Sequence, residues 1–255
     1  MNLELLDWSI LGPAIVAGFL VLSTHVPLGK EVLKRGIIFI DLAIAQIAGL
    51  GVLAAGVLGW EEHFWVVQVS AVGAALLASS SLNWTEKRWP ESQEALIGIL
   101  FVLAATGSIL LLAENPHGAQ HMKDLLVGQI LWTTWQSLAY VALLYAVLLT
   151  IWFKWHAQIG QKGFYIIFAF AVTASVQLIG VYLVFASLII PALATRRVAG
   201  KRGLYAGYLL GALAYLVGIM FSALFDLPSG AVTVWTMALM AVVAGNWLGY
   251  RLGKA

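Results

Sequence analysis

The most informative stretch of the sequence reads Val176-Gln-Leu-Ile-Gly-Val-Tyr-Leu-Val-Phe-Ala-Ser-Leu-Ile-Ile-Pro-Ala-Leu-Ala-Thr-Arg-Arg-Val-Ala-Gly-Lys-Arg202. Its apolar run is long enough to reach membrane depth and is interrupted by Gly180 and Pro191. It ends in four cations, Arg196, Arg197, Lys201 and Arg202. Membrane loops that remain in the cytoplasm carry the excess of Lys and Arg, so we expect this basic end to be cytoplasmic.

The composition predicts an integral membrane protein. Hydrophobic residues make up 62% of the chain and charged residues only 10%, whereas soluble domains have about 25% charged residues. Apolar runs recur along the whole chain, which favours helices over barrel strands. We expect an all-α membrane bundle in which residues 1–255 form a single transmembrane domain. The first run is expected to be retained, because Glu4 and Asp7 precede it where a secretory signal has cations.

Nine apolar spans are predicted. Two of them are short, so we expect eight or nine transmembrane helices. They fall at residues 9–29, 36–58, 64–82, 95–113, 130–153, 163–178, 180–195, 204–225 and 230–250. With the N-terminus outside and the C-terminus cytoplasmic, every Lys and Arg except Lys123 lies on the cytoplasmic side. A single helix over 163–195 would move Arg196 to Arg202 outside, so we predict a break at Ile179-Gly180. We also expect Pro191 to break the helix.

Four polar residues are candidates for a translocation path. Asp41 lies inside the second span, where an ionisable group is a functional candidate because its burial is costly. A salt bridge from Asp41 to Lys34 or Arg35 at the membrane surface is the simpler alternative. Gln46 lies deeper in that span, and Gln177 and Ser187 flank the break, where exposed backbone groups suit an ion or solute. Each of these three can equally make a structural hydrogen bond.

A second, external site is suggested by histidines. His117 and His121 are four residues apart, a spacing that on one helical face can hold a divalent metal, and solvated loop residues are the simpler alternative. Gly118 argues against a regular helix there, and we expect a short surface helix only over 122–128.

Catalysis by this chain is not expected. The sequence contains no phosphate-binding loop, no nucleophile elbow and no His-Glu-x-x-His motif. It has no Cys, which excludes disulfides and thiolate ligands. Every His is predicted to lie at a span end or in a loop, so we expect no clustered acid and base at membrane depth. No cofactor and no nucleic-acid partner are expected.

Several motifs together resemble the membrane permeases of ATP-binding-cassette importers for zinc, manganese or iron. The strongest match runs from Leu178 to Arg196, with its Leu-Ile-Gly, apolar run and Ile-Ile-Pro-Ala. The remaining matches follow in order: Pro27-Leu28-Gly29, Glu94 to Ile99, Leu126 to Leu131 and Asp226 to Ala231.

The resemblance implies a division of labour. Two permease copies, as a homodimer in lipid, would form the pore in a prokaryotic inner membrane. Cytoplasmic ATPase subunits would bind ATP, and an extracytoplasmic metal-binding protein would deliver the divalent metal cargo. Residues 154–163 resemble the segment that docks on the ATPase, which assigns coupling to Ala157 and Gly160, with Arg196 and Arg197 nearby.

The second span departs from the family pattern Gly-Asp-Ala-Leu-Ser-His-Ala-x-Leu-Pro-Gly. Aligned without gaps to Gly51, the family Asp falls on Leu42 and the family His on Gln46, with Asp41 displaced by one position. An amide oxygen suits zinc less well than imidazole nitrogen does. Three functions therefore stay open: a metal importer, an importer of this fold with another cargo, and a secondary carrier in which Asp41 titrates with protons or sodium.

Overall fold

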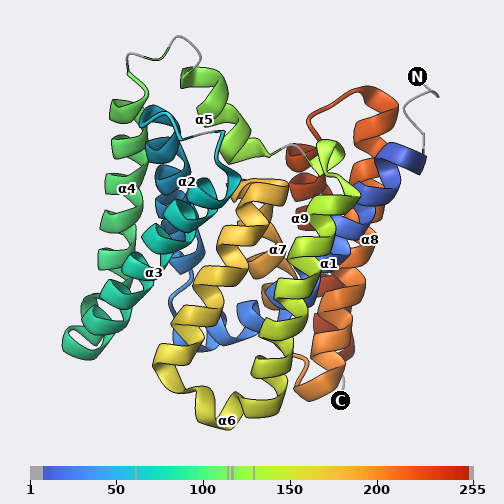
Figure 1. The fold of residues 1–255 in the computed structure, drawn as a ribbon. Helices are drawn as coiled ribbons and strands as arrows, with labels where there is room; N and C mark the ends of the chain where they lie inside the picture. The colour runs from blue at the N-terminus through green and yellow to red at the C-terminus, as the bar shows by residue number, and fades with distance from the viewer. Residues whose placement is uncertain (1–7, 61, 114, 116–117, 129, 253–255) are drawn as a thin grey trace. The chain divides into compact units, whose positions relative to one another are not determined.

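The structure is a computed structural model that describes residues 8–60, 62–113, 115, 118–128 and 130–252, without the side chains of 119, 156, 157 and 245–252. All regular secondary structure in this part of the chain is helical (Figure 1). The elements are α1 (Trp8–Arg35), α2 (Ile40–Val57), α3 (Phe64–Arg88), η2 (Pro90–Ser92), α4 (Gln93–Leu111), α5 (Gly118–Val127), η3 (Ile130–Trp132), α6 (Trp135–Ile179), α7 (Val181–Ala194), α8 (Gly200–Phe225) and α9 (Ser229–Leu252).

Among the described residues, seven helical segments are long and apolar enough to cross a membrane, and two further apolar helices are shorter. α6 supplies two of the seven, Trp135–Trp155 and Gln158–Ile179, because its backbone leaves helical geometry at Trp155 and Gly160. The short ones are α7 and the Ser229–Ala244 part of α9. Large apolar side chains such as Leu77, Leu110 and Val243 are exposed, as lipid-facing residues are. The expected all-α polytopic membrane bundle is confirmed.

The chain divides into two compact units. Unit 1 comprises residues 1–35, 127–146 and 178–255, and unit 2 comprises 36–126 and 147–177. Whether they form the single domain expected from sequence stays a prediction.

Unit 1 is built around α7, which packs against α1, α8 and α9. Most of α7 is buried, and small residues let its neighbours approach closely, as is usual between membrane helices. The ring of Tyr215 on α8, for example, covers Gly18 on α1 so closely that a Cβ at Gly18 would overlap it. Within this unit, the start of α1 and the end of α9 lie at opposite ends (Figure 1).

Unit 2 is centred on α2, which packs against α3 and α4. Gly51 on α2 faces Ser70 of α3, where a Cβ would lie 2.7 Å from the Ser70 carbonyl oxygen. α5 follows the loop after α4. The second arm of α6 also belongs to this unit, where Tyr165 and Gln93 of α4 meet through a hydrogen bond of 3.3 Å.

The helix break expected at Gly180 is present in the structure. α6 ends at Ile179, Gly180 adopts φ +80°, and α7 begins at Val181. Gly180 lies against the backbone of Gly128, which also has a positive φ of 70°, and a Cβ on either residue would collide with the other chain segment. The two glycines thus allow a direct crossing of backbones.

Pro191 does not break the helix as the sequence predicted, because α7 continues through it to Ala194. Packing against three other helices holds the helical backbone where Pro removes one hydrogen bond. The expected short helix at 163–178 is also longer than predicted, since the arm begins at Gln158.

Gly118 is the first residue of α5 rather than a helix breaker. A Cβ at this position would lie 2.7 Å from the Leu112 carbonyl oxygen, so glycine is required by the close approach of the preceding chain. The helix predicted over 122–128 consequently begins four residues earlier.

Candidate translocation site

Asp41 is the most informative buried polar residue. It is the second residue of α2 and is 0% exposed, and neither carboxylate oxygen has a hydrogen-bond partner among the described residues. Its place in the first turn puts it at the positive end of the helix dipole, which stabilises a negative charge. The salt bridge to Lys34 or Arg35 considered above is not formed; the one ion pair within the described residues joins Arg35 to Glu31. A buried carboxylate without a partner has the donor atoms that a cation requires.

Gln46 is also buried, at 1% exposure, and its Oε1 has no partner among the described residues. The two side chains lie five positions apart, so they leave α2 roughly 140° from each other. α2 alone therefore does not present Asp41 and Gln46 on one face, and any cation bound by Asp41 needs ligands from elsewhere.

The residues on either side of the Gly180 break have different surroundings. Gln177 is exposed, and its Oε1 accepts a hydrogen bond from Gln68 Nε2 at 2.6 Å. Ser187 is buried, donates to the Leu183 carbonyl oxygen at 2.6 Å and lies 2.7 Å from the Tyr215 hydroxyl. Ser187 thus has the hydrogen bonds that a structural role requires, and a path role for either residue stays a prediction.

His25 was missed by the sequence analysis, which placed every His at a span end or in a loop. α1 continues through Pro27 to Arg35, so His25 lies within the helix and is 0% exposed. The helix persists because the Tyr208 hydroxyl donates to the Ser23 carbonyl oxygen at 3.0 Å, the group that Pro27 cannot bond. His25 Nδ1 lies 3.0 Å from the Val21 carbonyl oxygen, while Nε2 has no partner among the described residues.

The predicted coupling segment forms the turn between the two arms of α6 (Figure 1). Gly160 has φ 57° and ψ −169°, a conformation that only glycine adopts readily. The side chain of Ala157 lies outside the described residues. Next to the turn, Glu86 at the end of α3 accepts hydrogen bonds from Gln161 Nε2 and from the Tyr165 hydroxyl, the latter at 2.7 Å. The turn therefore has a defined neighbour in unit 2.

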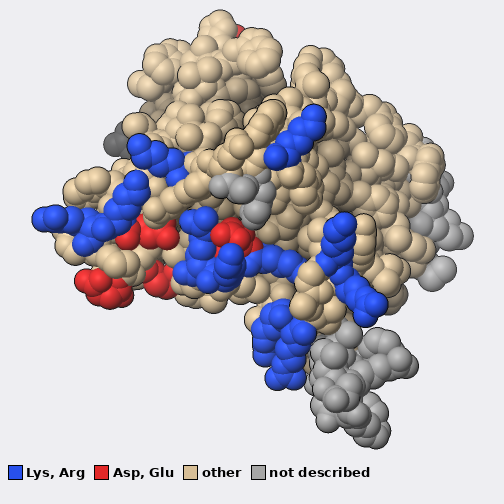
Figure 2. Space-filling view, turned by 90° about the horizontal axis from the view of Figure 1, so that it is seen from below, with Lys and Arg blue, Asp and Glu red and all other residues tan. Residues whose placement is uncertain are grey.

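Figure 2 shows Lys and Arg side chains, with fewer Asp and Glu side chains visible. Arg196 and Arg197 follow α7 and are exposed. Neither guanidinium group forms an ion pair or hydrogen bond with another described residue. Their predicted role in ATPase coupling stays a prediction, but both guanidinium groups are available to an anionic partner.

The external metal site was predicted from two histidines. His117 lies outside the described residues, and His121 is exposed on α5. In the part of the chain that the structure describes, no three or more His, Asp or Glu side chains gather in a group able to hold a metal ion.

Among the described residues, the seven long apolar helices are those of a polytopic membrane protein, and the unpartnered carboxylate of Asp41 is a candidate cation ligand within it. Residues 7–159 and 156–246 match the ABC 3 transport family. The chain belongs to this family.

Known relatives agree with the assignment. A protein of Chlamydia trachomatis described as a probable metal transport system membrane protein is 21% identical over 250 residues, covering 88% of this chain and 84% of the relative. The solved structure of PsaBC from Streptococcus pneumoniae in complex with Fab superposes with a TM-score of 0.76 at 20% identity, covering 96% of this chain and 95% of that one. The resemblance stated from the sequence motifs is confirmed.

Proposed function

We propose that the chain is the permease subunit of an ATP-binding-cassette importer that moves a divalent metal ion across a prokaryotic inner membrane. A separate cytoplasmic ATPase drives it, an extracytoplasmic binding protein delivers the ion, and two permease copies form the pore. Family membership supports the transport role, and the relative described as part of a metal transport system supports the class of cargo. The observation that carries the proposal is the buried carboxylate of Asp41, whose oxygens have no described partner.

The donor atoms on α2 favour some metals over others. Asp41 offers carboxylate oxygens, and oxygen ligands suit Mn²⁺ better than they suit Zn²⁺, which binds nitrogen and sulfur well. Among zinc, manganese and iron, we therefore propose manganese as the preferred cargo. The absence of the family His from α2 is the sequence feature behind this preference.

Transport by this mechanism requires two conformations that differ in access to the bound ion. ATP binding by the partner is proposed to shift the permease between them through the Gly160 turn of α6, because an effector moves an equilibrium only by contacting one state better than the other. A secondary carrier, in which Asp41 exchanges protons or sodium, needs no such partner.

The test is uptake of radiolabelled manganese, zinc and iron into vesicles that contain the chain and its ATPase. The variants are Asp41→Asn, which removes the charge, and Gln46→Ala, which removes the amide oxygen. The matched control is Asp226→Asn: Asp226 is exposed and has φ 52°, a conformation that Asn tolerates. Folded protein is checked by gel filtration in each case.

We expect ATP-dependent manganese uptake that falls by about ten-fold or more in Asp41→Asn, since even residues that only orient metal ligands are worth 10 to 100-fold. Asp226→Asn should keep wild-type uptake. ATP-independent uptake that follows a proton or sodium gradient would establish the secondary carrier instead. ATP hydrolysis without movement of any of the three metals would show that the cargo is of another kind.

A further inference from the structure

We propose that a groove between α7 and α9 binds one anionic phospholipid, with its acyl chain on apolar side chains and its phosphate on Arg196 and Arg197. The groove lies within unit 1 and encloses about 480 Å³. This volume falls in the range of roughly 300–1,000 Å³ that is usual for small-molecule sites. The proposal does not depend on the proposed transport function.

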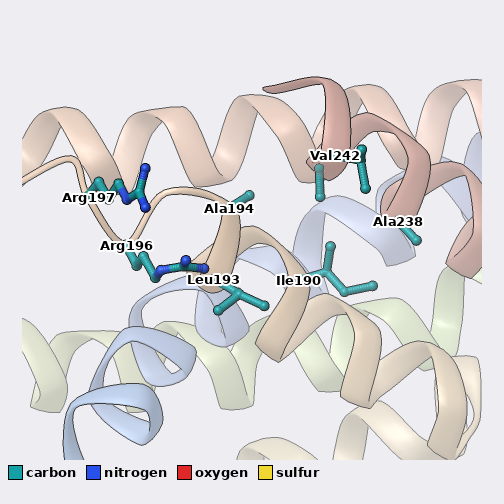
Figure 3. A pocket seen from close by; sticks show the side chains of 8 residues that line it. Ile190, Leu193, Ala194, Arg196, Arg197, Ala238 and Val242 are labelled. Carbon is teal, nitrogen blue, oxygen red and sulfur yellow. The ribbon is translucent and has the colours of Figure 1, made fainter. Parts of the chain in front are cut away.

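The groove has an apolar floor and a cationic end (Figure 3). α7 contributes Ile190, Leu193 and Ala194, and α9 contributes Ala238, Ala241 and Val242. The two remaining lining residues are the arginines, which follow directly on α7. One end of the groove therefore suits hydrocarbon and the other suits an anion, as in an amphiphile.

The chemistry of the arginines favours phosphate. Guanidinium presents a planar fork of donors that pairs with phosphate oxygens through two hydrogen bonds. Among the described residues, none that lines the groove is acidic, and neither guanidinium group is paired with another side chain. Basic pockets between membrane helices are known to bind anionic head groups.

A second copy of the chain fits the groove less well. A two-fold interface centred on this groove would bring Arg196 and Arg197 near their own copies, and the described lining residues include no carboxylate to pair with them. Anionic lipid brings the opposite charge and is present throughout the membrane. The observations thus favour lipid over a second permease copy at this position.

The experiment is native mass spectrometry of the full-length chain with equal amounts of dioleoyl phosphatidylglycerol and dioleoyl phosphatidylcholine. The double variant Arg196→Gln/Arg197→Gln removes both cations of the groove. Lys201→Gln/Arg202→Gln removes the same charge from the start of α8, outside the groove lining, and is the matched control. Ala241→Trp fills the apolar floor while leaving the charge unchanged.

We expect wild type to retain phosphatidylglycerol in preference to phosphatidylcholine. In the groove double variant, the preference for phosphatidylglycerol should fall roughly ten-fold or more, since each cation near anionic lipid raises the affinity for that lipid about five-fold. The control variant should stay within about two-fold of wild type, and Ala241→Trp should weaken retention of both lipids. Equal losses in the two double variants would overturn the proposal in favour of general surface charge.

A second measurement tests whether a second permease copy covers the groove instead of lipid. The chain has no Cys, so Val242→Cys introduces a single thiol at a groove position that is 63% exposed. Labelled with a fluorophore, it should be quenched by phosphatidylglycerol carrying a nitroxide on its acyl chain. Efficient disulfide formation between two Val242→Cys copies, with no quenching, would mean that a second permease covers the groove and would refute the lipid site.

Discussion

Glu86 shows how a single side chain can connect the coupling turn to the rest of unit 2. Its carboxylate accepts from Gln161 and Tyr165 on the second arm of α6. The Tyr165 hydroxyl is in turn reached by Gln93 Nε2 at 3.3 Å, and Gln93 also donates to the Leu82 carbonyl oxygen at 3.0 Å. These bonds link the first residues after Gly160 to both α3 and α4, so Glu86 is placed to position the turn.

The variant Glu86→Gln should loosen this link. Hydrogen bonds to a charged group contribute about 1.5–3 kcal/mol each, so we expect a lower thermal midpoint and fewer metal ions transported per ATP hydrolysed. Glu62→Gln, at an exposed position between α2 and α3, is the control. A Glu86→Gln/Tyr165→Phe cycle should give a coupling energy of about 0.5–3 kcal/mol in unfolding. An unchanged ratio of transport to hydrolysis would limit Glu86 to a stabilising role.

At the scale of elements, the crossing of Gly128 and Gly180 fixes where α6 ends and α7 begins. Both glycines have a positive φ, and their backbones leave no space for a Cβ. Gly230, near the start of α9, approaches the Val127 carbonyl oxygen in the same way. Three segments that are distant in sequence are thus held together by backbone contact at glycine positions.

The substitution Gly180→Ala should destabilise the chain through two separate effects. The backbone of Gly180, with φ 80° and ψ 162°, costs an L-residue about 1–3 kcal/mol, and the collision with Gly128 adds about 1–3 kcal/mol of overpacking. Gly59→Ala separates these effects, because Gly59 has φ 77° but nothing within 4 Å of its Cβ position. Thermal unfolding of the purified chain should show a clearly larger loss for Gly180→Ala, and equal losses would rule out the backbone crossing.

The positions of the helices were largely predictable from sequence, whereas the roles of individual helix-breaking residues were not. The break at Gly180 followed from the requirement that Arg196 to Arg202 stay on the side of the other cations. Pro191 was predicted to break its helix, yet it lies inside α7, and Pro27 likewise lies inside α1. What decides such positions is a contact from another helix, such as Tyr208 to Ser23, and a single sequence does not reveal it. The burial of His25 was hidden for the same reason.

Asp41 was identified as a candidate from the sequence, but its surroundings were not. Its position within an apolar span was enough to single it out, because ionisable residues at membrane depth are costly. Which groups surround it depends on how α2 packs, and the alternative of a surface salt bridge could be excluded only once its burial was known. Gln177 and Ser187 looked equivalent in sequence, but one is exposed and the other is bonded to Tyr215.

At the scale of the whole molecule, the distribution of charge predicts an orientation that single-cysteine labelling can test. Because the chain has no Cys, each introduced thiol reports one position. Glu62→Cys and Lys123→Cys, both exposed, should react with a membrane-impermeant maleimide in intact cells. Lys162→Cys and Lys201→Cys should react only after permeabilisation, because the excess of Lys and Arg keeps their loops inside. The opposite labelling pattern would place the Gly160 turn outside, out of reach of any cytoplasmic ATPase, and would refute the proposed coupling together with the orientation.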